Sequence, residues 1–118
     1  MSLLLSLLLT VQPQRTVSVS AKDPAPHISV GIAENAVTSF LLYAEPTKAE
    51  LLLDGRKEDV PIHKNTVHIV AKKAKIGAKG VLTAFMPGGQ KLVIEAIMTK
   101  FDLADGYITV VVVDERGG

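Results

Sequence analysis

The chain has 118 residues, a formal net charge of +1 and no cysteine. This length suits one domain that can bury a core without a covalent staple, and the absence of cysteine excludes disulfides, thiolate catalysis and zinc–thiolate sites. The near-neutral charge gives no overall attraction to nucleic acid or anionic lipid. Aromatic residues are only 4% of the chain, so few side chains could stack on the bases of a nucleic acid.

The first apolar run, Ser2–Val11, contains six leucines. Ten residues are too few to cross a bilayer as a helix, so we expect no membrane span. The run has the length of the apolar part of a signal peptide, but no lysine or arginine precedes it. Residues 1–15 are therefore either a retained signal-like segment or a first hydrophobic strand. In both cases the strip offers candidate partner contacts, which are Leu3, Leu4, Leu5, Leu7, Leu8 and Leu9.

Eight short runs rich in valine, isoleucine, leucine and threonine then follow along the chain. They are Thr16–Ala21, His27–Ala33, Ala36–Ala44, Lys48–Leu53, Thr66–Ala71, Gly80–Met86, Lys91–Met98 and Gly106–Val113. Several alternate apolar and polar residues, which is the period of a strand with one buried face. Ala36–Ala44 is apolar on both faces, which predicts a central strand between two layers. Lys48–Leu53 fits either a strand or one helical turn.

Turn residues separate these runs. Asp54-Gly55 predicts a tight turn, and the glycines of Pro87–Gln90 predict a hairpin. We expect Arg56–Asp59 to be a charged loop, Val60–Ile62 a brief edge strand and Thr99–Asp105 a crossing loop with a helical turn. No repeat or linker divides the chain. Residues 1–118 are therefore predicted to form one all-β domain, a β-sandwich that is immunoglobulin-like in the broad sense and has about 7–9 strands.

No motif predicts a catalytic, cofactor or metal site, and we expect a protein that is not an enzyme. His63 and His68 are five residues apart, which places them on opposite faces unless the turn between them folds them together. Asp102 and Asp105 lack the alternating oxygen ligands of a calcium loop. The densest like-charge cluster is interpreted as a solvated loop, with contact to a phosphate or an acidic partner as the alternative. It comprises Lys72, Lys73, Lys75 and Lys79.

Four stretches of the chain carry a family resemblance, namely Arg15–Val19, Asp23–Pro26, Ile28–Val30 and Thr38–Tyr43. In this order they resemble a myxobacterial paralogous family of unknown function, whose members begin with a signal peptide and a β-rich domain. The strand layout is also similar to the N-terminal β domain of the outer-membrane core-complex subunit of type IV secretion machines, and to secretin-type periplasmic modules. These resemblances imply small β domains that assemble, favour a periplasmic or secreted location, and supply no catalytic residue.

The first hypothesis for function is therefore a non-enzymatic interaction or assembly module, a subunit of a larger exported or multi-subunit structure. We expect a protein partner or self-assembly into a homo-oligomer, without a cofactor and without nucleic acid. One alternative is a structural or decoration protein of a virion or particle. Another is a ubiquitin-like modifier, because Arg116-Gly117-Gly118 resembles the tail of such proteins, although that fold needs a central helix that the sequence does not show.

Overall fold

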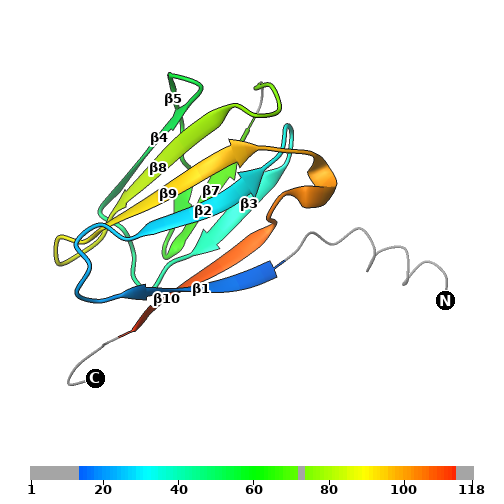
Figure 1. Cartoon of the computed structure of the whole chain (residues 1–118). Helices are drawn as coiled ribbons and strands as arrows, with labels where there is room; N and C mark the ends of the chain where they lie inside the picture. The colour runs from blue at the N-terminus through cyan, green and yellow to red at the C-terminus, as the bar shows by residue number, and fades with distance from the viewer. Residues whose placement is uncertain (1–13, 72–73, 114–118) are drawn as a thin grey trace, which may run out of the picture.

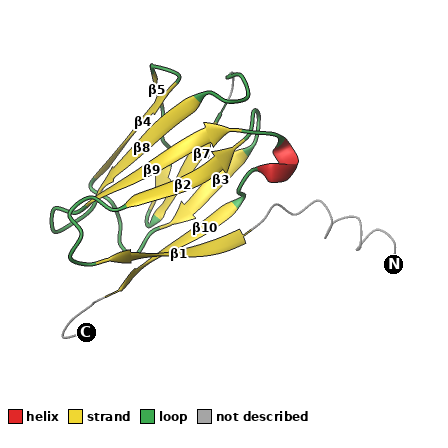
Figure 2. Ribbon diagram, in the orientation of Figure 1, coloured by secondary structure: helices red, strands yellow, loops and turns green. Residues whose placement is uncertain are grey.

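A computed structural model describes residues 14–71 and 74–113, and it is built almost wholly of strands (Figures 1 and 2). The described strands are β1 (Gln14–Ser20), β2 (His27–Ile32), β3 (Val37–Leu41), β4 (Lys48–Leu53), β5 (Arg56–Glu58), β6 (Ile62–His63), β7 (Thr66–Val70), β8 (Lys79–Phe85), β9 (Lys91–Met98) and β10 (Tyr107–Val113). A short 3-10 helix, η1 (Phe101–Leu103), precedes β10. The predicted all-β class is confirmed, but the described residues form ten strands where about 7–9 were predicted, because the short outer strands β5 and β6 have no apolar alternation to mark them. No helix in these two ranges is long and apolar enough to cross a membrane.

The ten strands form two sheets of five. Sheet 1 has the order β1-β10-β3-β7-β6, and sheet 2 has the order β2-β9-β8-β4-β5. Three neighbouring pairs are parallel: β1 with β10, β10 with β3, and β2 with β9. Because β1 pairs with β10, the first and last described strands lie side by side along one margin of the molecule (Figure 1).

One hydrophobic cluster contains buried residues of both sheets, so the core lies where the sheets face each other. Phe40, Ile69 and Ile108 from sheet 1, with Leu82 and Ile94 from sheet 2, have no exposed surface. Phe40 is the largest of these side chains and the others are aliphatic. The core is thus built from the alternate, inward-pointing residues of the longer strands, and β5 and β6 have no buried residue.

Two hairpins end in turns that need backbone in the left-handed region. Asp54 and Gly55 have φ angles of 52° and 78° and join β4 to β5. Gly88 and Gly89 have φ angles of 94° and 95° and join β8 to β9. Glycine adopts these angles without the steric cost that a side chain adds, and both predicted turns are confirmed.

Several predictions about single elements need correction. Arg56–Glu58 was expected in a loop but forms β5, paired with Leu51–Leu53 of β4. It was missed because a short edge strand with charged, water-facing side chains has no apolar alternation. The run at Ala36–Ala44 gives a central strand, but β3 ends at Leu41 and only one of its faces is buried, since Val37 is 46% exposed. Lys48–Leu53 is a strand, and the helical turn after Thr99 is confirmed as η1.

Candidate functional site

The outer face of sheet 2 carries a cluster of exposed apolar side chains, formed by Leu52, Val81 and Ile97. Each is 39–49% exposed. Leu52 and Val81 are directly paired across β4 and β8, and Ile97 lies diagonally across β9 from Val81. Side chains in these positions share one face of a sheet and touch their neighbours. We call these three residues the sheet 2 patch; Lys79 and Glu95 stand beside them and give charges of both signs.

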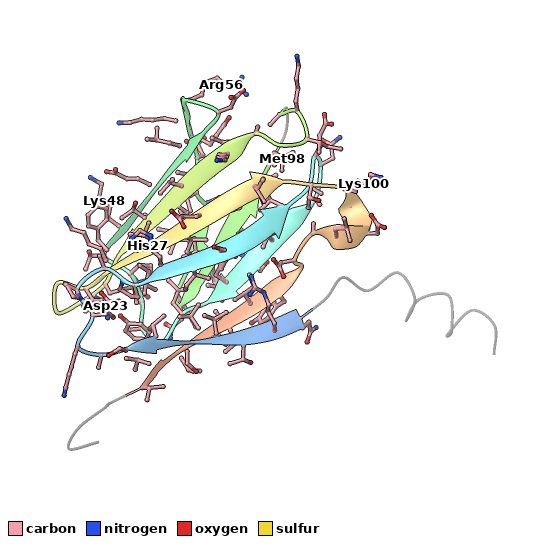
Figure 3. All side chains as sticks on the ribbon, viewed as in Figure 1. Asp23, His27, Lys48, Arg56, Met98 and Lys100 are labelled. Carbon is pink, nitrogen blue, oxygen red and sulfur yellow. The ribbon has the colours of Figure 1, made fainter. Side chains whose placement is uncertain are left out.

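An open hollow of about 1060 Å³ lies at one end of the two sheets. Figure 3 shows Arg56, Met98 and Lys100, three of its lining residues, at that end, away from Asp23 and His27. Ile76 and Phe101 also line it and are more than half exposed. Acidic residues belong to the same rim, namely Glu34 and Asp54. The hollow therefore combines apolar surface with charges of both signs and has no clear preference for an anionic or a cationic ligand.

The structure separates the predicted basic contacts. Lys75 is exposed and lines the hollow, whereas Lys79 begins β8 on the outer face of sheet 2. Lys72 and Lys73 lie outside the described residues, as do all six predicted leucine contacts: Leu3, Leu4, Leu5, Leu7, Leu8 and Leu9. Two of the ten predicted contact residues can therefore be placed, and they do not form one site.

The turn at Lys64 brings the two neighbouring histidines onto one face of sheet 1. Lys64 has a φ of 55°, and His63 pairs with Thr66, which shares its face with His68. The prediction that His63 and His68 lie on opposite faces is therefore wrong, and the alternative, in which the turn folds them together, is confirmed. The ranges 14–71 and 74–113 contain no group of three or more residues able to hold a metal ion.

His68 also takes part in a pair that the sequence did not indicate. Its Nδ1 lies 2.8 Å from Ser39 Oγ, and the two residues are directly paired across β7 and β3. A serine beside a histidine can be a nucleophile and its base, but such pairs need a third group that orients the imidazole. Within the described chain no carboxylate bonds to His68, so the geometry is that of a polar cross-strand pair.

The carboxylate of Asp105 joins the margins of both sheets. One oxygen accepts from Arg15 Nε at 3.0 Å, and the other accepts from Arg15 Nη2 at 3.3 Å and from Gly31 N at 2.9 Å. Arg15 Nη2 also donates to the carbonyl of Ser29. We call this arrangement the edge clamp, because it satisfies backbone groups along the open side of β2. Both oxygens of Asp105 are therefore engaged within the fold, which leaves it unsuited to a calcium loop.

Among the residues that the structure describes, two titratable groups have shifted pKa values, and neither marks a catalytic site. Burial raises the pKa of Tyr43 above its ordinary value of 10.0, and its hydroxyl donates to Gln90 Oε1. A hydrogen bond from Lys48 and the attraction of its charge lower the pKa of Glu50 on the surface. The Lys48–Glu50 distance is 2.7 Å, and Lys48 also stands 5.7 Å from the Phe85 ring. Both shifts follow from ordinary packing and pairing.

The last residues of β10 have an open side. β10 pairs with β1 over seven residues, from Tyr107 to Val113, but with β3 only from Tyr107 to Thr109. Val111, Val112 and Val113 are 36%, 41% and 43% exposed. We call these three consecutive valines, together with the neighbouring strand position that β3 does not occupy, the β10 slot.

Comparisons with known proteins add no family to this geometry. No protein-family model matches the chain, and no curated protein matches it in sequence. The resemblance to the myxobacterial family and to secretion-machine β domains therefore stays a prediction from the residues that carry it.

Proposed function

We propose that the protein is a non-enzymatic interaction and assembly module that works as a subunit of a larger exported or multi-subunit structure, and that its first partner is another copy of itself. The proposal depends on one observation, the grouping of exposed apolar side chains on regular strands. Of the eleven large apolar side chains that are exposed among the described residues, six gather in the sheet 2 patch and the β10 slot. Contiguous apolar surface of this kind is typical of protein interfaces.

Burial of these side chains contributes a favourable free energy to association. Burying a valine, leucine or isoleucine completely is worth about 1.5–3 kcal/mol, so each half-exposed side chain can contribute roughly half of that. Six such residues, Leu52, Val81, Ile97, Val111, Val112 and Val113, offer several kcal/mol before the cost of association is subtracted. The total is roughly 4–9 kcal/mol, and because association itself costs about 4–15 kcal/mol, these side chains alone support weak self-association that further buried surface strengthens.

We also propose that the two sheets form a β-sandwich that is immunoglobulin-like in the broad sense. The single core shared by both sheets supports this two-layer arrangement. The parallel pairing of β10 with β3 differs from the antiparallel sheets of immunoglobulin domains, so the likeness extends to the layers and not to the strand order.

The alternatives make different demands on the structure. A ubiquitin-like modifier needs a helix packed on a sheet, and residues 14–71 and 74–113 contain only the three-residue η1, so no observation favours that alternative. A decoration or particle protein shares the assembly surfaces proposed here. Electron microscopy of concentrated protein separates it from a small oligomer, because particles or tubes are then visible.

Sedimentation velocity over a concentration series tests the proposal. We expect the weight-average mass to rise with concentration, and Leu52→Lys with Val81→Lys to weaken that rise if the sheet 2 patch contributes. Thr16→Lys, an exposed polar position of sheet 1, is the matched control. A wild-type chain that stays monomeric at every concentration contradicts the proposal.

A further inference from the structure

The backbone alternation of β10 leaves hydrogen-bonding groups without a strand partner. Ser39 N donates to Gly106 O, and Ala21 N donates to Val113 O. In parallel pairing, successive residues turn their N–H and C=O groups to opposite neighbours, so 106, 108, 110 and 112 face β3 while 107, 109, 111 and 113 face β1. Because the β10–β3 ladder ends at Thr109, the N–H and C=O of Val112 point into the β10 slot, where no described strand pairs with them.

Three of the four outer strands of the described sheets are shielded, namely β2, β5 and β6, whereas β1 and the β10 slot are not. The edge clamp occupies the free side of β2 at Ser29 and Gly31. The outer strands β5 and β6 have three and two residues, and β5 is charged. Short, charged or covered edges prevent strands of other chains from adding. The β10 slot instead presents valines on both faces beside unpaired backbone groups, which is what an added strand requires.

The chain itself supplies a segment of matching chemistry. Ser2–Val11 has six leucines and no charged residue. The leucines nearer the N-terminus can reach the β10 slot of their own chain, so the experiment has to separate docking within one chain from docking between copies. Val11 cannot reach it, because Gln14 pairs with Tyr107, whereas the slot begins at Val111, roughly 16 Å away across two strands. Three residues of chain, from Val11 to Gln14, span at most about 11 Å.

We infer that Ser2–Val11 of one copy adds as a strand to the β10 slot of a second copy, where the backbone of Val112 pairs with it and the leucines cover the valines. The inference rests on the proposed function and names the surface and the segment that carry the assembly. Each copy then has one donor segment and one acceptor slot, so the assembly is a reciprocal dimer or a head-to-tail series. The β1 edge, which carries polar Thr16 and Ser18, is the competing acceptor.

Engineered cysteines test the contact directly, because the natural chain has none. Leu7→Cys and Val112→Cys proteins are mixed, oxidised and separated on a non-reducing gel. Docking raises the local thiol concentration, so we expect mixed disulfide dimer to form at least about tenfold faster than with the control Asp59→Cys, an exposed position outside both the β10 slot and the sheet 2 patch. Equal rates of dimer formation with Val112→Cys and with the control overturn the inference. A double variant, Leu7→Cys with Val112→Cys, also overturns it if it forms only an intramolecular disulfide at every dilution.

A pair of prolines separates this inference from the proposed function. Val112→Pro removes the N–H that faces the slot and leaves the β1 ladder intact, whereas Thr16→Pro removes the equivalent N–H on the open side of β1. Circular dichroism first establishes that both variants fold; if Val112→Pro does not, the cysteine result decides alone. We expect Val112→Pro to abolish the oligomer and Thr16→Pro to retain it. If the oligomer is lost only with Thr16→Pro, or is retained in both variants, the inference is overturned and the proposed function stands. If the wild-type chain is monomeric, the inference and the proposed function are both overturned.

Discussion

Replacing Asp105 by alanine removes the edge clamp, and the cost of that change can be worked from its contacts. The Asp105 side chain is only 15% exposed, whereas Arg15 is 42% exposed and can return to water. An exposed ion pair is worth about 0.2–1 kcal/mol, and a backbone donor bonded to a charged group adds about 1.5–3 kcal/mol. Since Gly31 N loses its acceptor in a partly buried place, we expect the free energy of unfolding to fall by about 2–3 kcal/mol.

Urea unfolding followed by circular dichroism measures this loss. With a denaturant dependence of about 1–3 kcal/mol per molar, the midpoint is expected to fall by roughly 1–2 M. Asp102→Ala, at an exposed position in the same crossing segment, is the matched control and should change stability by less than about 0.5 kcal/mol. A variant Asp105→Ala that is as stable as wild type, or an equal loss with Asp102→Ala, refutes the reasoning.

Three further predictions concern the pH dependence, the packing and the surface. Because burial raises the pKa of Tyr43, the folded state holds its proton longer than the unfolded chain, so this contribution to stability is complete below pH 10 and is lost as the pH rises through the raised value. Tyr43→Phe should therefore flatten the loss of stability above pH 10 in alkaline urea titrations, and an unchanged slope counts against this. A Cβ at Gly80 would lie 3.0 Å from Leu52 O and Leu53 Cδ1, so Gly80→Ala should cost about 1–3 kcal/mol in thermal unfolding, and a neutral result shows that β4 can move aside. Leu52→Lys should leave the free energy of unfolding within about 0.5 kcal/mol of wild type while it weakens association; a large loss of stability would mean that the side chain supports the fold.

The strands that the sequence predicted are those with strong alternation. β2 and β9 bury every second residue, and the glycine turn before β9 marks its start, so both could be found from spacing alone. β5 could not be found, because its side chains face water and its pairing with β4 is set by the turn at Asp54 and Gly55.

The features that join distant parts of the chain were beyond the sequence. Arg15 and Asp105 are 90 residues apart, and nothing in the local pattern indicates that a parallel β1–β10 pair brings their margins together. The Ser39–His68 pair depends in the same way on the register of β3 against β7. The open end of β10 follows from the early end of β3 at Leu41, although the run of apolar residues continues beyond it. A single sequence indicates such contacts only weakly, because the alternation of side chains shows which residues of a strand share a face but not which strand lies beside it.

Native mass spectrometry of the wild-type chain tests the central claim, that this protein acts through contact with further copies, most directly. The chain has a mass of 12.6 kDa, and we expect multiples of this mass whose share grows with protein concentration. A single species at 12.6 kDa over the whole concentration range contradicts the claim.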